Sequence, residues 1–262
     1  MNSLIVLSMA AGGYLIGAFS MARIITRIVS PQTKITDKFE VGLEGSDKKL
    51  VLGTVSASWV SYHVGSKWGF LTYILDMLKI VIPAVVVRRL WPSEPYFLVA
   101  AAAGVAGHIW PVYYRFRGGR GISAIYGGFL VIDWVGMLVC SIGGMVLGLV
   151  VWRDVLTAYM AGVVLIIPWV FFRTHNPAFV LYAIVVNIFF VIAMLPEIRN
   201  WRRIKREKAW DDPAAVIQLS GMGRGLIKMG RKLGLIKKNN DGSGTARPET
   251  PRTAGESKKD AS

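Results

Sequence analysis

The sequence predicts an all-α, polytopic integral membrane protein, a bundle of about seven transmembrane helices. Hydrophobic residues make up 53% of the 262 residues, and the mean hydropathy is +0.45. They come in runs of about 20, the length that a helix needs to cross a bilayer. Basic residues gather between and after these runs, as in loops on the cytoplasmic side of a membrane. The single cysteine, Cys140, excludes an intramolecular disulfide and a cysteine-based metal site.

The expected spans follow from the apolar runs in order along the chain. The first run, 3–25, could also be a secretory signal peptide, but it lacks a basic leading region and contains internal glycines, which favours a retained span. The stretch 122–152 is too long for one upright helix and is interrupted at Asp133, so two antiparallel helices are expected there, the first of them short. The other expected spans are 68–90, 96–114, 155–172 and 178–195.

The composition divides the chain into a transmembrane domain, 1–198, a basic segment, 199–238, and a tail, 239–262. From Arg199 onward there are 16 Lys and Arg against 7 Asp and Glu. Within the basic segment, "GRGLIKMGRKLGLIKK" alternates apolar and basic residues and is expected to lie on anionic membrane lipids as an amphipathic helix. A basic tail can also bind nucleic acid, but this one leaves a span directly, which favours membrane lipids and no nucleic acid. The final tail has too few apolar residues to fold.

The charge distribution also predicts the orientation. The positive-inside rule puts the basic C-terminus in the cytoplasm, and seven spans then put the N-terminus outside. We therefore expect a multi-pass protein of the plasma (inner) membrane. The loops 26–67 and 115–121 and the turn at 153–154 would face the cytoplasm. Three arginines fall on the outer side and oppose this arrangement, namely Arg88, Arg89 and Arg173.

A glycine- and arginine-rich loop, "GHIWPVYYRFRGGRGIS", stands between two apolar runs. Its glycines lack a Cβ, so their N–H groups can converge on an anion, beside the positive end of the following helix. Guanidinium groups can add paired hydrogen bonds to a phosphate. The alternative is an ordinary basic loop at the membrane surface. The expected phosphate-binding residues are Arg117, Gly118, Gly119, Arg120 and Gly121.

Ionisable side chains within the apolar runs mark a second feature. Asp76 and Lys79 are three residues apart and share one helix face. Charges within a span are costly, so they pair or face a polar cavity, and a structural salt bridge and a substrate-facing pair are both compatible with this spacing. His108 lies on a helix of small residues, where it could satisfy a hydrogen bond, reach a phosphate or move a proton.

Hydroxyl side chains precede the second span. Thr54, Ser56 and Ser58 could hydrogen-bond a polar ligand or could act as loop and cap residues. Motifs of other catalytic classes are missing from the sequence. It has no Gly-x-Ser-x-Gly elbow and no zinc-ligand spacing, and its three histidines lie on different segments. No metal and no cofactor are therefore expected.

The loop resembles the central motif of the acyl-phosphate:glycerol-3-phosphate acyltransferase family (PlsY type), Gly-His-x-x-Pro followed by Gly-Gly-Lys-Gly, with Arg120 in place of the lysine. "LTYILDMLKIVIPA" is similar to the family's Asp-x-x-Lys helix, and the likeness covers roughly residues 5–206. The resemblance implies a bundle of helices that moves a fatty acyl group from acyl phosphate to glycerol 3-phosphate, giving lysophosphatidate and phosphate. It also implies catalytic roles for Asp76, Lys79 and His108, without acyl-CoA or a metal.

Several positions depart from the family pattern. Trp59 and Tyr62 stand where the first cytoplasmic motif has an asparagine and an arginine, Leu156 stands where a serine is expected, and Glu197 stands where a histidine falls. These departures leave open a family member with another acceptor, or a non-catalytic one that binds a phospholipid precursor or a partner protein. A transporter is a further alternative, because intramembrane charge pairs also occur there, but the sequence contains no inverted repeat.

Under the resemblance, the site must hold two phosphates close together, because acyl phosphate is already activated and no covalent nucleophile is required. Such catalysis depends on positioning and charge stabilisation. The glycine loop would hold the acyl phosphate, while Lys79 and the hydroxyls would approach glycerol 3-phosphate. His108 and a phosphate oxygen remain alternative proton acceptors.

Overall fold

The computed structural model describes residues 2–36, 39–43, 46–52, 55–152 and 155–206. Thr54, the part of the basic segment beyond Arg206 and the 239–262 tail lie outside the described residues. The last helix continues through residue 198, the expected end of the transmembrane domain, to Arg206.

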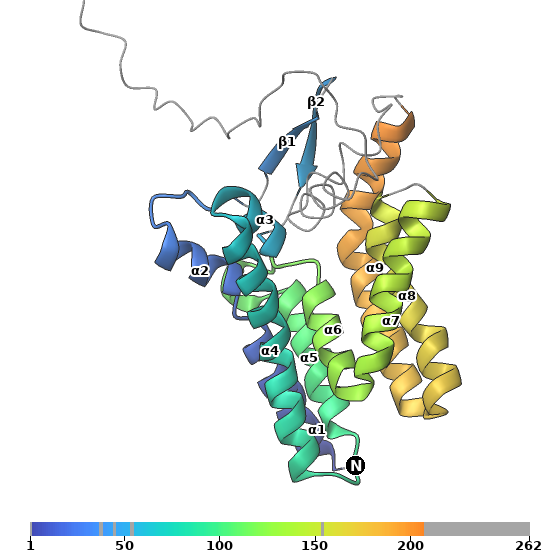
Figure 1. Ribbon diagram of the computed structural model, residues 1–262. Coiled ribbons are helices and arrows are strands. Elements are labelled where there is room, and N and C mark those ends of the chain that lie inside the picture. Colours follow the sequence, from blue (N-terminus) through green and yellow to red (C-terminus); the bar gives the residue numbers. More distant parts are fainter. Residues whose placement is uncertain (1, 37–38, 44–45, 53–54, 153–154, 207–262) are drawn as a thin grey trace, which may run out of the picture.

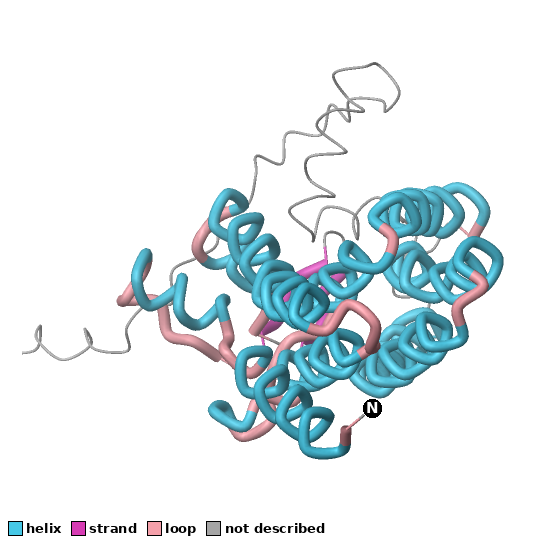
Figure 2. Tube along the Cα trace, turned by 90° about the horizontal axis from the view of Figure 1, so that it is seen from below, coloured by secondary structure: helices cyan, strands magenta, loops and turns pink. Residues whose placement is uncertain are grey.

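Of the described helices, the seven longest run side by side as an elongated bundle (Figure 1). Figure 2, turned by 90°, shows most of them nearly end-on. Their bounds are α1 Ser3–Gly17, α4 Ser66–Leu90, α5 Tyr96–Ile109, α6 Ile122–Ile132, α7 Trp134–Val146, α8 Val155–Thr174 and α9 Pro177–Arg206. At one end of the bundle lie the shorter helices α2, Met21–Val29, and α3, Ala57–His63, together with the hairpin of β1, Phe39–Leu43, and β2, Ser46–Leu52. Two single turns complete the described elements, a 3₁₀ turn at Val112–Tyr114 and a π turn at Leu147–Val151.

The helical membrane fold is confirmed. Five helical segments are long and apolar enough to cross a membrane, namely Ser3–Val29, Ser66–Leu90, Tyr96–Tyr114, Leu156–Thr174 and Pro177–Asn200. The predicted break at Asp133 separates α6 from α7, and both of these helices are shorter than the five. Helix length alone therefore supports five spans, and the predicted seven requires α6 and α7 to cross as well.

Two local features differ from the sequence prediction. The first apolar run, expected as one helix over 3–25, ends at Gly17 and restarts at Met21, because the Ser20 hydroxyl accepts a hydrogen bond from the Arg23 amide and caps α2. The strands Phe39–Leu43 and Ser46–Leu52 pair in an antiparallel hairpin in which Phe39 lies opposite Leu52. The bundle is all-α as predicted, and the hairpin is an addition to the loop between α2 and α3.

Small residues bring the helix backbones close together. Gly13 and Gly17 of α1 lie against Ala100 and Gly104 of α5, so closely that a Cβ on Gly17 would overlap the Gly104 carbonyl. Gly144 of α7 meets α8 in the same way. This close approach is typical of helix pairs in lipid, where van der Waals packing and not hydrophobic burial drives association.

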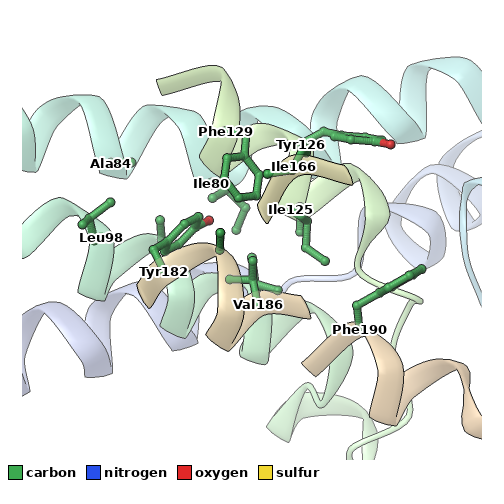
Figure 3. Packing of buried hydrophobic residues seen from close by; sticks show 14 of the residues in the cluster. Ile80, Ala84, Leu98, Ile125, Tyr126, Phe129, Ile166, Tyr182, Val186 and Phe190 are labelled. Atoms are coloured by element: carbon green, nitrogen blue, oxygen red, sulfur yellow. The ribbon is translucent and has the colours of Figure 1, made fainter. Parts of the chain in front are cut away.

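The bundle buries one main apolar core, to which α4, α5, α6, α8 and α9 contribute most (Figure 3), and α7 adds Cys140. Many large apolar side chains remain on the outside of the bundle, as expected for helices that face lipid tails. Examples on the bundle helices are Leu4, Leu7, Phe70, Leu90, Phe172 and Leu181.

Two of the arginines that opposed the predicted orientation are engaged by the protein. The Arg173 Nε lies 2.8 Å from the Asp133 carboxylate, which also accepts a hydrogen bond from the Trp169 indole. Arg88 donates to the Val131 carbonyl near the end of α6. Arg173 is neutralised by its partner, so counting it as a free charge overstates the positive charge at this end of the bundle.

Candidate functional site

A buried cluster of three ionisable side chains connects α4 to α5. Lys79 Nζ lies 2.8 Å from Asp76 Oδ1, and His108 Nδ1 lies 3.5 Å from the same oxygen. Between 3% and 8% of each residue is exposed. Asp76 and Lys79 form a buried ion pair, and the imidazole of His108 lies on the same carboxylate oxygen. The sequence spacing predicted the Asp76–Lys79 pair, and the structure adds His108 to it.

The break between α1 and α2 also contacts this cluster. Lys79 Nζ donates a hydrogen bond of 2.6 Å to the carbonyl of Phe19, which follows the end of α1. A carbonyl that has left the helix is free to accept such a bond. The ammonium is therefore held between a carboxylate on its own helix and a main-chain oxygen 60 residues earlier.

The glycine loop lies directly on His108. The Gly119 amide donates to the His108 carbonyl at 3.1 Å. A Cβ on Gly119 would lie 3.0 Å from the imidazole Cε1, and nearer still to Nε2. A Cβ on Gly118 would meet the carbonyls of His108 and Ile109. Both glycines are therefore required by the close approach of the loop to the end of α5.

This geometry differs at one point from the expected loop, whose amide N–H groups all converge on a phosphate. The Gly119 amide is bonded within the protein, so it is not among the donors left for a phosphate in this structure. Gly121 has a φ of 92°, in the left-handed region that glycine adopts without strain, and it immediately precedes α6. Earlier in the loop, Arg115 and Phe116 have left-handed φ values of 53° and 60°. The loop reverses direction through these residues before α6 begins.

Arg120 points away from the glycines and into the protein. Its Nε lies 2.7 Å from Glu197 Oε1 on α9, and its Nη1 donates at 3.4 Å to the Tyr159 hydroxyl on α8. The guanidinium carbon lies 5.5 Å from the centroid of the Tyr159 ring. Burial acts to lower the pKa of Arg120, but the Glu197 carboxylate and the Tyr159 hydroxyl together raise it, so the guanidinium stays charged.

The Arg120–Glu197 pair was not predicted from the sequence. Its two partners are 77 residues apart. The available signal was that both positions depart from the family pattern, a lysine replaced by Arg120 and a histidine replaced by Glu197. Two charged replacements can mark residues that meet, and one sequence alone cannot show which ones do.

The remaining predicted site residues lie around the same end of the bundle. Arg117 is exposed in the glycine loop. Ser56 precedes α3, and Ser58 is within it. The buried Ser56 hydroxyl has no hydrogen-bond partner in the part of the chain that the structure describes. Because α3 packs on the first turns of α4, with Gly69 against Ala57, these hydroxyls lie at the loop end of α4.

Aromatic side chains occupy the two positions on α3 where the chain departs from the family's first motif. Trp59 is fully buried and stacks on His63, with ring centroids 4.2 Å apart. Tyr62 is half-buried and meets the same imidazole edge-on at 5.1 Å. Burial lowers the pKa of His63, although its bond to the Trp59 carbonyl opposes the shift. An apolar, aromatic patch therefore replaces polar groups on α3.

A bundle of lipid-facing helices that buries a carboxylate, an ammonium and an imidazole beneath a glycine- and arginine-rich loop defines an integral membrane protein with a polar site at one end. The family model described as glycerol-3-phosphate acyltransferase matches residues 7–208. The chain therefore belongs to the glycerol-3-phosphate acyltransferase family.

Relatives of known sequence and structure agree with this assignment. The glycerol-3-phosphate acyltransferase of Syntrophotalea carbinolica is 32% identical over 183 residues, which cover 69% of this chain and 84% of the relative. That of Trichlorobacter lovleyi is 27% identical over 183 residues, covering 70% and 86%. The crystal structure of the integral membrane enzyme PlsY in its lysophosphatidic acid form has the same fold, with a TM-score of 0.61 and 23% identity over 76% of this chain and 92% of PlsY. Its glycerol 3-phosphate form gives a TM-score of 0.60 at 22% identity over the same shares of the two chains.

Proposed function

We propose that this protein is an acyl-phosphate-dependent glycerol-3-phosphate acyltransferase of phospholipid biosynthesis. It transfers a fatty acyl group to glycerol 3-phosphate and releases lysophosphatidic acid and inorganic phosphate. The observation that carries the proposal is the buried Asp76–Lys79–His108 cluster beneath the glycine loop. Family membership and the substrate named in the PlsY structures support it.

The reaction requires positioning more than new chemistry. The acceptor hydroxyl oxygen attacks the acyl carbon and forms the ester bond, while the bond from that carbon to the phosphate oxygen breaks. Phosphate leaves with the electron pair, and the hydroxyl proton must be accepted nearby. Holding the two substrates together removes most of the entropic barrier, and cations stabilise the charge that develops on the acyl oxygen and the leaving phosphate.

Apart from Gly119, whose amide is bonded to the His108 carbonyl, each predicted residue receives a role in this proposal. Arg117, Gly118 and Gly121 bind the acyl phosphate at the loop, and the inward-pointing guanidinium of Arg120 adds a further positive charge. Lys79 binds glycerol 3-phosphate, and Asp76 holds the ammonium in place. The side-chain hydroxyls of Thr54, Ser56 and Ser58 complete the binding site for glycerol 3-phosphate.

The proton acceptor is a phosphate oxygen in this proposal. Nδ1 of His108 faces Asp76, and Nε2 lies where a Cβ on Gly119 would point. Only 8% of the residue is exposed, so an acceptor hydroxyl cannot reach the imidazole unless the loop moves. The phosphate oxygens need no such movement. His108 then acts by holding Asp76 and the loop together.

We further propose that the site end of the bundle faces the cytoplasm, with the protein spanning the plasma membrane several times. The basic segment 199–238 begins at the same end, since α9 runs toward α3 and the glycine loop (Figure 1). Positive-inside charge asymmetry supports a cytoplasmic C-terminus and an outer N-terminus. Water-soluble glycerol 3-phosphate reaches the site without crossing the bilayer in this arrangement.

The test is an assay of the purified full-length protein with palmitoyl phosphate and radiolabelled glycerol 3-phosphate. Labelled lysophosphatidic acid is expected from the wild type and not from Lys79→Met. Lys34→Met is the matched control, because Lys34 is exposed in the loop after α2 and is expected to leave turnover unchanged. A wild type that forms no acylated product would refute the proposal and leave a non-catalytic binding protein. Product formed only with another alcohol would show an altered acceptor, which the aromatic residues on α3 favour.

A further inference from the structure

The Arg120–Glu197 ion pair lies beside the proposed phosphate site, yet the proposed reaction makes no use of Glu197. The two side chains are 10% and 13% exposed, and Nε and Oε1 are 2.7 Å apart. The pair joins the glycine loop to α9, next to the Tyr159 hydroxyl of α8. A nearly buried charge pair of this kind is costly to desolvate, so each partner depends on the other.

The two buried cations at this end of the bundle each have a carboxylate partner before any substrate arrives. Lys79 is paired with Asp76, and Arg120 is paired with Glu197. Of the guanidinium nitrogens, Nε donates to Glu197 and Nη1 donates to Tyr159, whereas Nη2 donates no hydrogen bond within the described residues. Nη2 can therefore receive a phosphate oxygen, but that phosphate meets a guanidinium that already has a carboxylate partner.

We propose that Glu197 sets the affinity of Arg120 for the phosphate group of the substrate and of the phosphate product. In the empty site its carboxylate occupies the position of an anionic partner and keeps the guanidinium buried and oriented. When a phosphate binds at Nη2, two anions share one guanidinium and repel each other. This repulsion weakens phosphate binding and favours release of the phosphate product. The proposal rests on the proposed function only in naming acyl phosphate as the ligand whose phosphate is bound.

The substitution Glu197→Gln tests this role. Glutamine has nearly the same size, and its Oε1 can still accept from Arg120 Nε, so orientation is kept while the negative charge is lost. Repulsion between unit charges a few ångströms apart at an effective dielectric constant of about 20 is large enough for about a tenfold effect. We expect the inhibition constant of inorganic phosphate and the KM for palmitoyl phosphate each to fall about tenfold.

Asp133→Asn is the matched control. It removes a carboxylate from another arginine pair, Asp133 with Arg173, whose Nε and Oδ2 are 2.8 Å apart at the opposite end of the bundle. Both variants are expected to unfold at a lower temperature than the wild type. Only Glu197→Gln is expected to regain stability when inorganic phosphate is added, because the anion restores the charge balance around Arg120.

Equal responses of the two variants to inorganic phosphate would overturn the proposal and leave Glu197 with a purely structural role. If Glu197→Gln does not fold, Glu197→His serves in its place at pH 8, where imidazole is neutral, and the same tighter phosphate binding is expected. The phosphate-dependent thermal shift requires no turnover. An inactive wild type would therefore refute the acyltransferase proposal while this measurement still decides the role of Glu197.

Discussion

Replacing Gly119 by alanine adds one methyl group at the most crowded point of the site. The new Cβ would lie 3.0 Å from Cε1 and 3.2 Å from Cδ2 of His108, and closer still to Nε2. The imidazole has little room to retreat, because Asp76 lies 3.5 Å from its other nitrogen and the residue is 8% exposed. Overpacking of this kind costs about 1–3 kcal/mol.

That strain falls on the contacts that organise the site. If it is released by displacing His108 or the loop, the arrangement around Asp76 is lost in the reacting complex. Converted to a rate, about 1–3 kcal/mol corresponds to a fall in kcat/KM of about five- to 150-fold. We also expect a lower unfolding temperature. The assay is lysophosphatidic acid formation from palmitoyl phosphate, with thermal unfolding of the same detergent-purified sample.

Two further variants identify the cause. Gly12→Ala adds the same methyl group at a position with no atom within 4 Å, so activity and stability are expected to match the wild type. Combining Gly119→Ala with His108→Ala removes the ring that the new methyl group overlaps, and the stability lost on adding that methyl should be largely regained. A Gly119→Ala protein with full activity and an unchanged unfolding temperature would refute the close packing of loop and imidazole.

Three other outcomes are expected. Gly17→Leu should prevent assembly of the bundle, because a Cβ at this position overlaps the backbone of Gly104. Neither helix can move away without losing the α1–α5 contact, and detergent solubility and thermal unfolding measure the loss. Asp76→Asn should cost about 3–5 kcal/mol of stability by leaving the Lys79 ammonium buried without its carboxylate, and adding Lys79→Met should restore stability but not turnover. A reporter fused after Lys238 should read as cytoplasmic, and a signal from the outer side would contradict the orientation and the shared cytoplasmic site.

The membrane fold could be predicted because each helix must satisfy its own backbone hydrogen bonds in lipid. That requirement leaves apolar runs of recognisable length in the sequence, and it made the interruption at Asp133 visible. The break between Gly17 and Met21 was harder to find, since apolar residues continue across it and only Ser20 marks the new start. The hairpin of β1 and β2 lies outside the spans, where no such length rule applies.

The candidate site was predictable only where its residues are neighbours on one element. Asp76 and Lys79 are one helical turn apart, so helix geometry alone brings them together. The glycine loop was visible as a motif, but its contact with His108 was not, because that contact depends on how the loop folds back over α5. The expectation that the Gly119 amide faces a phosphate assumed an open loop, and the structure uses this amide to close it.

By itself, the sequence determined the class of protein, its principal helices, the charge asymmetry along the chain and the family to which it belongs. Each of these follows from local features, namely run length, residue type and spacing along one helix. Tertiary structure alone decided that His108 joins Asp76, that Phe19 supplies a carbonyl to Lys79, and that Arg120 meets Glu197. Those contacts join residues on separate elements, and their formation depends on how closely the helices pack, which the glycines between them allow.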